Sequence, residues 1–520
     1  MHEGRGMKDE TVFTSRRQFL RAAGAFTAGM AALPLFASGS TLADGMQSDA
    51  AVLRLKPGMP GAKVSEQLIG LSYETLQLQN PDFFSRKNEA LIGFLRQLNP
   101  QGVLRIGGNT SDFSVWSEYR GTLPVFENKP GVVFKRPYLV TPKQLANLAD
   151  FLRTTGWRLI FGVNLKADNP EMAAQLATAV HQAVGEQLLA IQIGNEPNDY
   201  PLAGGKEFSY DDYIQAWQRS AQAIRKAVSV PIAGPDTGAN TDWVLRFAEQ
   251  VPGIAAVSRH YYRGGAMDPT TSIAELLSGD PQFFKEAAQI SRTVGKRQLP
   301  FHLSEVNSYW SGGKLGVSNT FASALWGGDF ALASARAGVA GINIHSGMLS
   351  VLEASLDRNN DATVGNGSYK DRLDAISGRY SPIAGDIGLG FYARPLYYGL
   401  LLAQQFGGAQ FIETELTANG ANLTAYAADK QGRRLVALFN KDLQRDVDLR
   451  VDLGKAATRA QIWRLQARSL EEVHDVTLAG SEVGKDGRWV PKNVEAAQVA
   501  GDHFTVHLPR GSAALVFVEG

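Results

Sequence analysis

Short apolar runs alternate with amphipathic segments along most of this chain, and the alternation predicts a closed barrel. Apolar runs bounded by glycine, proline or polar residues suit strands that are covered on both faces, as in a parallel sheet. Eight such runs occupy residues 67–74, 102–108, 158–164, 189–196, 230–236, 255–262, 301–307 and 341–346. Amphipathic segments at 88–98, 142–155, 170–184, 210–228 and 321–337 lie between them. Eight strand and helix units predict an α/β fold, a (β/α)8 TIM barrel over residues 60–394.

The pattern changes to a period of two after about residue 395. Apolar and polar positions alternate in runs at 423–427, 434–440, 447–451, 461–465, 503–508 and 513–518. Short alternating strands with polar turns are typical of a β-sandwich, so we expect an all-β sandwich domain over residues 395–520. The barrel does not need an isolated strand near residues 50–58, and we expect that strand to join the sandwich domain.

Two arginines precede a weakly apolar run near the start of the chain. The segment Ser15-Arg16-Arg17-Gln18-Phe19-Leu20-Arg21 is followed by a run, rich in alanine and glycine, that ends at Ala37. This outline is that of a twin-arginine export signal over residues 1–43, and the apolar run is short for a membrane span. We therefore expect the twin-arginine export machinery as a partner and a periplasmic or secreted protein. The alternative is an uncleaved basic tail.

Charge and cysteine content narrow the chemistry. Lys and Arg total 52 against 51 for Asp and Glu, so the net charge gives no reason to expect a nucleic acid or an anionic membrane as partner. The 520 residues contain no cysteine, which excludes disulfides, thiolate metal sites and cysteine nucleophiles. Any catalyst must use oxygen or imidazole groups, and we expect neither a metal nor another cofactor.

Two of the predicted strands end in an acidic residue. The fourth run stops at Asn195, Glu196 and Pro197, and the seventh run carries Glu305 near its end. Ligand groups of a barrel lie at the carboxyl ends of its strands, so the two glutamates predict a glycosidase pair. A retaining pair lies about 5 to 5.5 Å apart, with an amide such as Asn195 placed to donate to the sugar 2-hydroxyl. The alternative makes Asn-Glu-Pro a simple turn and Glu305 a structural ion-pair partner.

Four short motifs lie at predicted strand ends. They are Arg-Ile-Gly-Gly-Asn-Thr-Ser-Asp-Phe at 105–113, Gly-Asn-Glu-Pro at 194–197, His-Tyr-Tyr at 260–262 and Ser-Glu at 304–305. Together they resemble glycoside hydrolase family 79, the β-glucuronidase and heparanase family. Similarity continues in outline over 397–408, so the resemblance spans most of the chain after the signal. Asn-Glu-Pro is shared by a whole clan of barrels, whereas the Gly-Gly segment and the His-Tyr-Tyr run point to this family.

The resemblance implies that Glu196 is the acid/base and Glu305 the nucleophile, in agreement with the pair expected from the strand ends. It also implies that Tyr261 hydrogen-bonds the nucleophile. Glu74, at the end of the first strand, would accept hydrogen bonds from sugar hydroxyls. The alternatives are a core aromatic residue for Tyr261 and a solvated strand end for Glu74.

A glucuronide carries a carboxylate, so its pocket needs hydrogen-bond donors. The resemblance implies backbone amides and tyrosine hydroxyls; the candidates are Tyr309, just after the nucleophile, and Tyr380, in the long segment after the eighth strand. Arg105 either orients a catalytic carboxylate or belongs to a buried structural ion pair. Three histidines at strand ends lack a metal-ligand spacing, so we expect them in the core. They are His260, His302 and His345.

These observations predict an exported retaining β-glycosidase that acts on a carbohydrate, specifically on β-D-glucuronides. The nearest alternative is an endo-acting, heparanase-like enzyme on a uronate polysaccharide, which the lack of a dense Lys and Arg cluster near the expected loops weakens. The same glutamates serve other sugars elsewhere in the clan, and a non-catalytic carbohydrate-binding protein is a further alternative. The segment 350–390, rich in Gly, Asp and Asn, is expected to wall the active cleft.

Overall fold

The computed structural model of the chain describes residues 51–124, 127–129, 132–133, 137–200, 208–356, 358 and 367–520. These residues belong to one compact unit. The expected export signal over residues 1–43 lies outside the described residues, so it remains a prediction. None of the described helices is long and apolar enough to cross a membrane.

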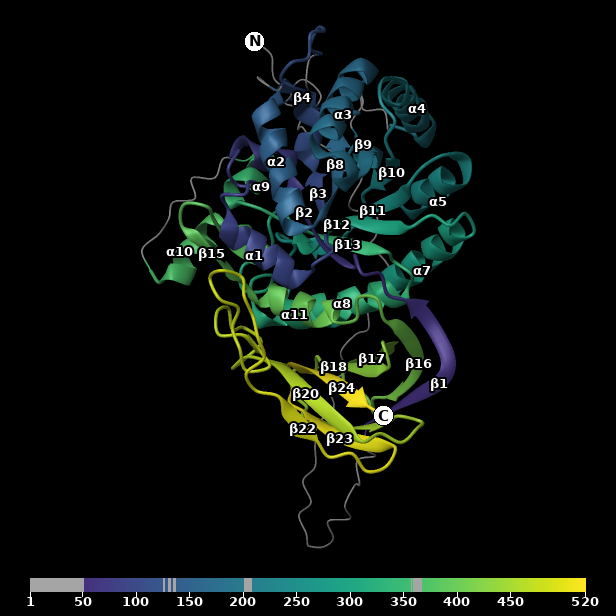
Figure 1. The fold of residues 1–520 in the computed structure, drawn as a ribbon, viewed down its shortest axis with the longest axis vertical. Helices are drawn as coiled ribbons and strands as arrows, with labels where there is room; N and C mark the ends of the chain where they lie inside the picture. The colour runs from purple at the N-terminus through teal and green to yellow at the C-terminus, as the bar shows by residue number, and fades with distance from the viewer. Residues whose placement is uncertain are drawn as a thin grey trace, which may run out of the picture. The chain divides into compact units, whose positions relative to one another are not determined.

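Eight parallel strands close into a barrel, as the apolar runs predict (Figure 1). Ile69 pairs with Ile342, and Leu71 pairs with Leu104, so the first predicted strand lies between the eighth and the second. All eight predicted strands are confirmed, and their carboxyl ends meet at one mouth of the barrel. In the order of the ring they are β10 (Ile232–Thr237), β11 (Ala256–Gly265), β12 (Phe301–Trp310), β13 (Gly341–Ser346), β2 (Ile69–Glu74), β3 (Val103–Gly107), β8 (Arg158–Val163) and β9 (Leu188–Ile193).

Helices surround these strands (Figure 1), and local sequence signals set where they begin. Thr141 caps α2 through a capping box with Gln144, and Pro142 takes the first helical position, where no N–H is needed. Asn169 likewise caps α3 ahead of Pro170. The five predicted helices, α1 to α4 and α8, are confirmed to within one residue at each end. The helices around the barrel are α1 (Glu89–Leu98), α2 (Pro142–Thr155), α3 (Pro170–Val184), α4 (Tyr210–Ala227), α5 (Thr241–Gln250), α6 (Ile273–Leu277), α7 (Pro281–Gly295) and α8 (Phe321–Arg336).

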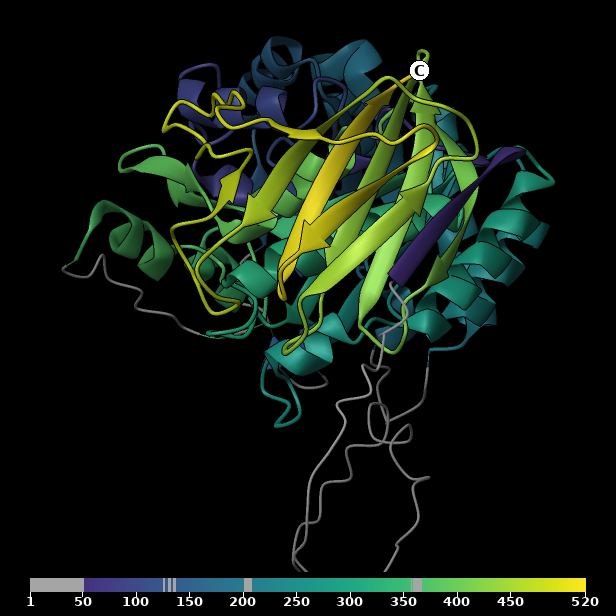
Figure 2. The same ribbon diagram turned by 90° about the horizontal axis from the view of Figure 1, so that it is seen from below.

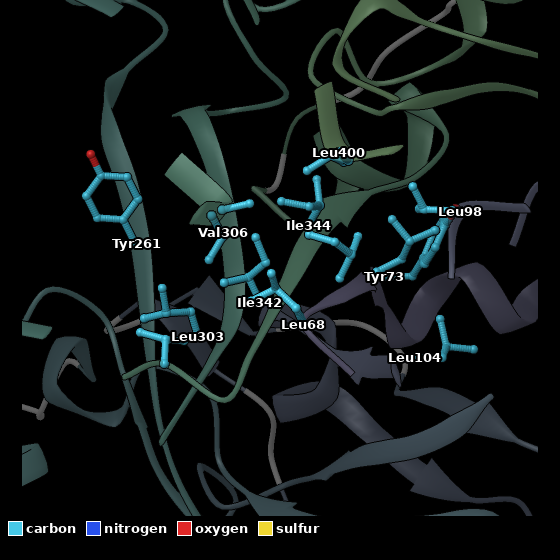
Figure 3. Packing of buried hydrophobic residues seen from close by; sticks show 14 of the residues in the cluster. Leu68, Tyr73, Leu98, Leu104, Tyr261, Leu303, Val306, Ile342, Ile344 and Leu400 are labelled. Carbon is cyan, nitrogen blue, oxygen red and sulfur yellow. The ribbon is translucent and has the colours of Figure 1, made fainter. Parts of the chain in front are cut away.

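Side chains alternate along the barrel strands between an apolar outer face and a polar interior. On β13, Ile342 and Ile344 belong to the apolar layer between strands and helices, part of which Figure 3 shows. Burial of each such side chain stabilises the fold by about 1.5 to 3 kcal/mol. Asn343 and His345, on the other face of the same strand, are buried as well. Asn343 Nδ2 donates to the carbonyl of Val103 at 2.9 Å, which satisfies the buried amide. The mouth of the barrel is therefore built on a polar interior.

The C-terminal strands form one sheet that folds over its own core, which confirms the predicted β-sandwich class. Strand β1 lies between the two halves of this sheet, antiparallel to β16 and parallel to β19 (Figure 2). Leu53 of β1 is buried in one cluster with Leu438 and Val506, which come from opposite halves. The strands are β1 (Ala51–Lys63), β16 (Gln410–Thr417), β17 (Leu423–Lys430), β18 (Arg433–Asn440), β19 (Val447–Asp452), β20 (Arg459–Gln466), β21 (Thr477–Leu478), β22 (Glu495–Ala497), β23 (His503–Leu508) and β24 (Ser512–Glu519).

A helix precedes the predicted strands of the sheet domain. Helix α11 (Pro395–Gln404) packs along α8, and the first C-terminal strand of the sheet begins at Gln410. The period-two pattern expected from about residue 395 therefore starts later. Because α11 is apolar and buried on every side, it lacks the polar face that reveals a period of 3.6 residues. The domain boundaries 60–394 and 395–520 remain a proposal.

The long segment after β13 contains short elements rather than one continuous loop. Residues 357 and 359–366 of this segment lie outside the described part of the chain. Between its second helix and its first strand, the chain brings Tyr380 close to Tyr262 of β11, with 6.4 Å between the ring centroids. The elements are α9 (Leu349–Ala354), α10 (Tyr369–Ile376), β14 (Ile383–Asp386) and β15 (Gly390–Ala393). Four further short strands follow β3: β4 (Ser114–Trp116), β5 (Glu127–Lys129), β6 (Val132–Val133) and β7 (Tyr138–Val140).

Candidate active site

Glu196 lies just beyond the carboxyl end of β9, in a sharp turn. Gly194 has φ +87°, and a Cβ there would lie 2.9 Å from Leu165, so this position requires glycine. Glu196 itself has φ 45°, a left-handed conformation that costs about 1 to 3 kcal/mol for a residue other than glycine. Its N–H donates to the carbonyl of Asp236 at 2.8 Å, and Pro197 begins the 3-10 helix η4 (Pro197–Asp199). The turn fixes the carboxylate at the barrel mouth.

Glu305 lies on β12 and is almost buried, with 8% of its surface exposed. Its Oε2 accepts from Arg105 Nη1 at 2.7 Å, and its Oε1 accepts from the hydroxyl of Tyr262 at 2.8 Å. Burial by itself raises the pKa of a carboxyl, but the neighbouring His345, His260 and Arg105 outweigh burial and hold the pKa of Glu305 well below its ordinary value. Glu305 is therefore ionised at neutral pH, as a carboxylate nucleophile must be.

His260 connects Glu196 to a buried acid. Its Nδ1 lies 3.0 Å from Glu196 Oε1, and its Nε2 lies 3.1 Å from Asp236 Oδ1. Burial lowers the pKa of an imidazole, but the carboxylates of Asp236 and Glu305 outweigh burial and raise the pKa of His260 to about 10. The hydroxyl of Ser304 also donates to Asp236. A protonated imidazole therefore stands beside Glu196 at neutral pH.

Arg105 joins the groups around both glutamates. Its guanidinium is fully buried and donates to Glu305 Oε2 and to Asp236 Oδ2, each at 2.7 Å. It also donates to Asn195 Oδ1 at 2.8 Å and to Gln192 Oε1 at 3.1 Å. A planar guanidinium can hold several acceptors in fixed directions, so these bonds set the orientation of Glu305. The structure unites the two predicted alternatives, because Arg105 both orients a carboxylate and belongs to a buried ion pair.

Glu74 is buried at the end of β2, which excludes the solvated strand end. Its Oε2 accepts from the backbone N–H of Thr110 at 2.9 Å and from the Thr110 hydroxyl at 2.7 Å. Gly108 has φ +73°, and a Cβ there would lie 2.3 Å from Glu74 Oε2, so glycine makes room for this carboxylate. His345 lies between the two acids, with Nε2 3.7 Å from Glu74 Oε1 and Nδ1 3.7 Å from Glu305 Oε2. Glu74 and Glu305 thus lie on either side of one imidazole.

The side chain of Asn195 is buried and forms hydrogen bonds with two other side chains. Its Oδ1 accepts from Arg105, and its Nδ2 donates to Oδ1 of Asn109 at 3.1 Å. Asn109 begins the 3-10 helix η2 (Asn109–Phe113), which also carries Thr110 and so supports Glu74. A side-chain amide has two N–H donors, so one remains for a ligand. The bond from Asn195 to a sugar 2-hydroxyl stays a prediction.

Tyr262, not Tyr261, donates to Glu305, so the predicted partner of Glu305 is wrong by one residue. The hydroxyl of Tyr261 donates to Asp280 at 3.1 Å, and its ring lies 4.7 Å from that of Phe330. Figure 3 shows Tyr261 among the core residues, as the alternative expected. Successive side chains of a strand point to opposite faces. Because His260 faces the interior, Tyr262 shares that face and Tyr261 cannot.

The structure brings only one of the two candidate carboxylate donors to the pair of glutamates. Tyr380 is buried, with its ring 6.0 Å from that of His345. Tyr309 donates its hydroxyl to Glu275 of α6, a carboxylate that also pairs with Arg263 at 2.9 Å. The hydroxyl of Tyr309, near the end of β12, is therefore used in a structural contact with α6.

Sequence reasoning missed several groups that surround the glutamates. Tyr262, Asp236 and Ser304 were absent from the predicted site, although Asp236 ends a predicted strand and Tyr262 belongs to the His-Tyr-Tyr motif. The three histidines expected in the core are all buried. Burial lowers the pKa of His302 to about 4, whereas His260 and His345 also lie against the glutamates. Across the described ranges, no group of three or more His, Cys, Asp or Glu side chains could hold a metal ion.

Comparison with known proteins was made at the level of sequence and of structure. No family model matches the chain. A β-glucuronidase of Aspergillus niger is 25% identical over 301 residues, which cover 52% of this chain and 55% of the relative. A β-glucuronidase of Neurospora crassa is 24% identical over 306 residues, 51% of this chain and 53% of the relative. The chain spans about half the length of the curated relatives it matches.

Solved structures show the same architecture over nearly the whole chain. The 4-O-α-L-rhamnosyl-β-D-glucuronidase from Fusarium oxysporum 12S has a TM-score of 0.68 at 19% identity, covering 89% of this chain and 99% of its own. The family 51 arabinofuranosidase from Xanthomonas axonopodis pv. citri has a TM-score of 0.62 at 17% identity, covering 90% and 100%. Both likenesses concern the fold.

The chain shares the barrel and sheet domain of these solved glycosidases, and about half of it is similar in sequence to two β-glucuronidases. This similarity agrees with the resemblance to glycoside hydrolase family 79 that the four motifs carry.

Proposed function

We propose that the protein is a retaining β-glucuronidase, which releases glucuronic acid from β-D-glucuronides. The observation that carries this proposal is the buried and ionised Glu305, held by Arg105 and Tyr262 near a second, more exposed carboxyl group on Glu196. The fungal relatives support the choice of sugar, but they match only about half of the chain, so the activity belongs to the proposal.

In the first step of the proposed reaction, Glu305 attacks the anomeric carbon and forms an ester with the sugar. The bond to the leaving oxygen breaks, and Glu196 gives its proton to that oxygen. The carboxylate that forms on Glu196 then faces the protonated His260 at 3.0 Å, which stabilises it. Tyr262 and Arg105 fix the direction of attack because they hold both oxygens of Glu305.

In the second step, water replaces the leaving group. Glu196 removes a proton from this water, the oxygen attacks the anomeric carbon, and Glu305 departs as a carboxylate. The buried Arg105 and Tyr262 again donate to the Glu305 oxygens, so the returning negative charge meets preorganised partners. Two displacements give a product with the anomeric configuration of the substrate.

Tyr380 is the proposed donor to the carboxylate of the sugar. Burial raises the pKa of Tyr380 well above its ordinary value, and the nearby Glu305 and Glu74 raise it further, so the hydroxyl keeps its proton. A protonated hydroxyl donates to an anionic ligand, whereas a phenolate would repel it. Tyr309 drops out of this proposal because its hydroxyl donates to Glu275.

Export by the twin-arginine route is part of the proposal. It rests on the Arg16-Arg17 pair and the following apolar run. Replacing both arginines by lysine should keep the protein in the cytoplasm of a host with this pathway, while the unchanged chain appears outside it. Equal export of both forms would contradict the route.

A panel of chromogenic substrates tests the activity. We expect 4-nitrophenyl β-D-glucuronide to be preferred over the matching glucoside by at least about 10³-fold in kcat/KM, because donors placed for a carboxylate are left unpaired by a hydroxymethyl group. Proton NMR of the first product should show the β-anomer. Preference for the α-L-arabinofuranoside would contradict the proposed substrate. An α-anomer as the first product would contradict the retaining mechanism. Cleavage inside a uronate polysaccharide would instead favour the heparanase-like alternative.

A further inference from the structure

The backbone around Tyr380 is held by several elements of the barrel. The N–H groups of Arg379 and Tyr380 both donate to the carbonyl of Gly312, at 2.7 and 3.3 Å. The Tyr380 carbonyl accepts from Asn307 Nδ2 at 3.1 Å, two residues after the nucleophile on β12. Gly378 donates to the carbonyl of Gly347 at 2.9 Å. The position of the Tyr380 hydroxyl therefore depends on a short backbone segment, residues 377–381.

A buried ion pair fixes the other side of this segment. Arg394 is 2% exposed and donates from Nη1 to the carbonyl of Gly378. Its Nε donates to Oδ1 of Asp374 on α10 at 2.6 Å, and the hydroxyl of Tyr392 donates to the same oxygen. Burial by itself raises the pKa of the Asp374 carboxyl, but the bond from His474 and the charge of Arg394 hold that pKa below its ordinary value. Asp374 is therefore a charged acceptor at neutral pH.

The sheet domain reaches this ion pair from outside the barrel. His474 lies between β20 and β21, and its Nε2 lies 2.8 Å from Oδ2 of Asp374. Lys370 of α10 adds two bonds to the same domain, to the carbonyl of His474 at 2.9 Å and to Glu482 at 3.0 Å. Asp374 is thus shared, with one oxygen bound to the barrel side and the other to the sheet domain.

We propose that His474 is a positioning residue for the active site: through Asp374 and Arg394, the sheet domain fixes the Gly378 carbonyl and with it the hydroxyl of Tyr380. This inference rests on the proposed function, in which Tyr380 donates to the sugar carboxylate. It gives the sheet domain a part in substrate recognition. Loss of His474 frees one oxygen of Asp374, which lets α10 and the Gly378 backbone shift relative to β12.

Steady-state kinetics of the full-length chain test this inference with a double-mutant cycle. His474→Leu should raise KM for 4-nitrophenyl β-D-glucuronide about tenfold, with kcat changed by less than about threefold, because the change displaces a binding group and leaves both glutamates in place. In the background of Tyr380→Phe, His474→Leu should have no further effect on KM, since the two changes act through one hydroxyl. His474→Gln, which keeps a donor near the Nε2 position, should restore most of the loss.

Tyr398→Phe is the matched control. It removes another bond between barrel and sheet domain, from the Val483 N–H to the Tyr398 hydroxyl at 3.0 Å, which does not lead to Tyr380. We expect KM within about twofold of the unchanged protein. Equal KM changes in His474→Leu and Tyr398→Phe, or additive effects of His474→Leu and Tyr380→Phe, would overturn the inference. Should His474→Leu not fold, Lys370→Met, which removes only the bonds of Lys370, takes its place with a smaller expected rise.

Hydrogen exchange separates a failure of this inference from a failure of the proposed function. The amides of Arg379 and Tyr380 should exchange faster in His474→Leu than in the unchanged chain and Tyr398→Phe, whatever the substrate is. Unchanged exchange would overturn the inference even if the protein cleaves glucuronides. Faster exchange in a protein without glucuronidase activity would support the contacts from His474 to Tyr380. It would contradict the proposal that the sugar is a glucuronide.

Discussion

Glu305 lies on β12 and Glu196 lies just beyond the end of β9, with β10 and β11 between these strands in the ring. The surroundings of the two glutamates differ. Both oxygens of Glu305 accept from fixed donors, and 10% of its side chain is exposed. The carboxylate of Glu196 lies against the imidazole of His260, and 22% of the Glu196 side chain is exposed. A nucleophile needs one charge state and one direction of attack, whereas an acid/base must gain and lose a proton within each turnover. The contrast therefore agrees with the proposal that Glu305 is the nucleophile and Glu196 the acid/base.

The largest effect is expected from removing the nucleophile. Glu305→Gln keeps the shape of the side chain and removes the attacking oxygen anion, so kcat should fall by at least about 10⁴-fold. The measurement is the release of 4-nitrophenol from the glucuronide, with circular dichroism to show that the variant is folded. Activity within tenfold of that of the unchanged enzyme would contradict the role of Glu305 as the nucleophile.

Removing the acid/base should give an effect that depends on the leaving group. Glu196→Ala should lower kcat about 10²- to 10⁴-fold for aglycones of high pKa and far less for 2,4-dinitrophenol, which departs without a proton. Azide should restore turnover, because the open space at Glu196 admits an anion that attacks the glycosyl-enzyme. An equal loss with all leaving groups, and no response to azide, would show that Glu196 is not the proton donor.

Two adjacent tyrosines sharpen the comparison, because each serves as the control of the other. Tyr262→Phe removes a donor to Glu305 and should lower kcat about tenfold to a hundredfold. Tyr261→Phe removes a bond to Asp280 on the outer face, so kcat should stay within about twofold while stability falls by about 1 kcal/mol. Substrate turnover and urea unfolding of both variants check this. The reverse order of effects on kcat would mean that β11 presents the other face to the barrel interior.

The last prediction concerns how the free energy of unfolding depends on pH through a group beside Glu196. The pKa of His260 in the folded protein, about 10, lies above its ordinary value of 6.5. The stabilisation from the imidazolium is therefore complete below about pH 6.5, and it is lost as the pH rises through about 10, with a slope of at most about 1.4 kcal/mol per pH unit. His260→Asn, which keeps a donor near the Nδ1 position, should lack this slope. Unfolding free energies between pH 6 and about 10.5 measure the difference, and parallel curves for both proteins would contradict the charged state of His260.

Much of the fold could be predicted because the barrel signals are local. Each strand run is bounded by glycine, proline or polar residues, and Pro142 and Pro170 mark helix starts. The buried helix α11 could not be recognised in this way, since an apolar residue on every face leaves no period to detect. The helical conformation of α11 depends on its packing between α8 and the sheet domain, and the sequence does not show this packing.

The residues of the candidate site also fall into two groups, those that a local sequence pattern reveals and those that depend on tertiary contacts. Glu196 and Glu305 could be found because each is an acid at the end of an apolar run. The choice between Tyr261 and Tyr262 depends on which face of β11 is turned inward, and the pairing of β11 with β12 shifts between Arg259 and His260. In the polar barrel interior, Asp236 binds Arg105 and His260, and His345 lies 3.7 Å from Glu305, across strands far apart in the sequence. These contacts form only when the eight strands close into a barrel, so no local sequence pattern predicts them.

Trapping of the glycosyl-enzyme tests the central claim most directly. A 2-deoxy-2-fluoro-β-D-glucuronyl fluoride should glycosylate the protein. The fluorine at C2 slows both displacements, whereas the fluoride leaving group speeds only the first, so the glycosyl-enzyme accumulates. Intact mass spectrometry should show one added 2-fluoroglucuronyl group, and peptide mapping should place it on Glu305, with no label in Glu305→Gln. Labelling at Glu196, or no covalent adduct while the substrate is still hydrolysed, would contradict the account.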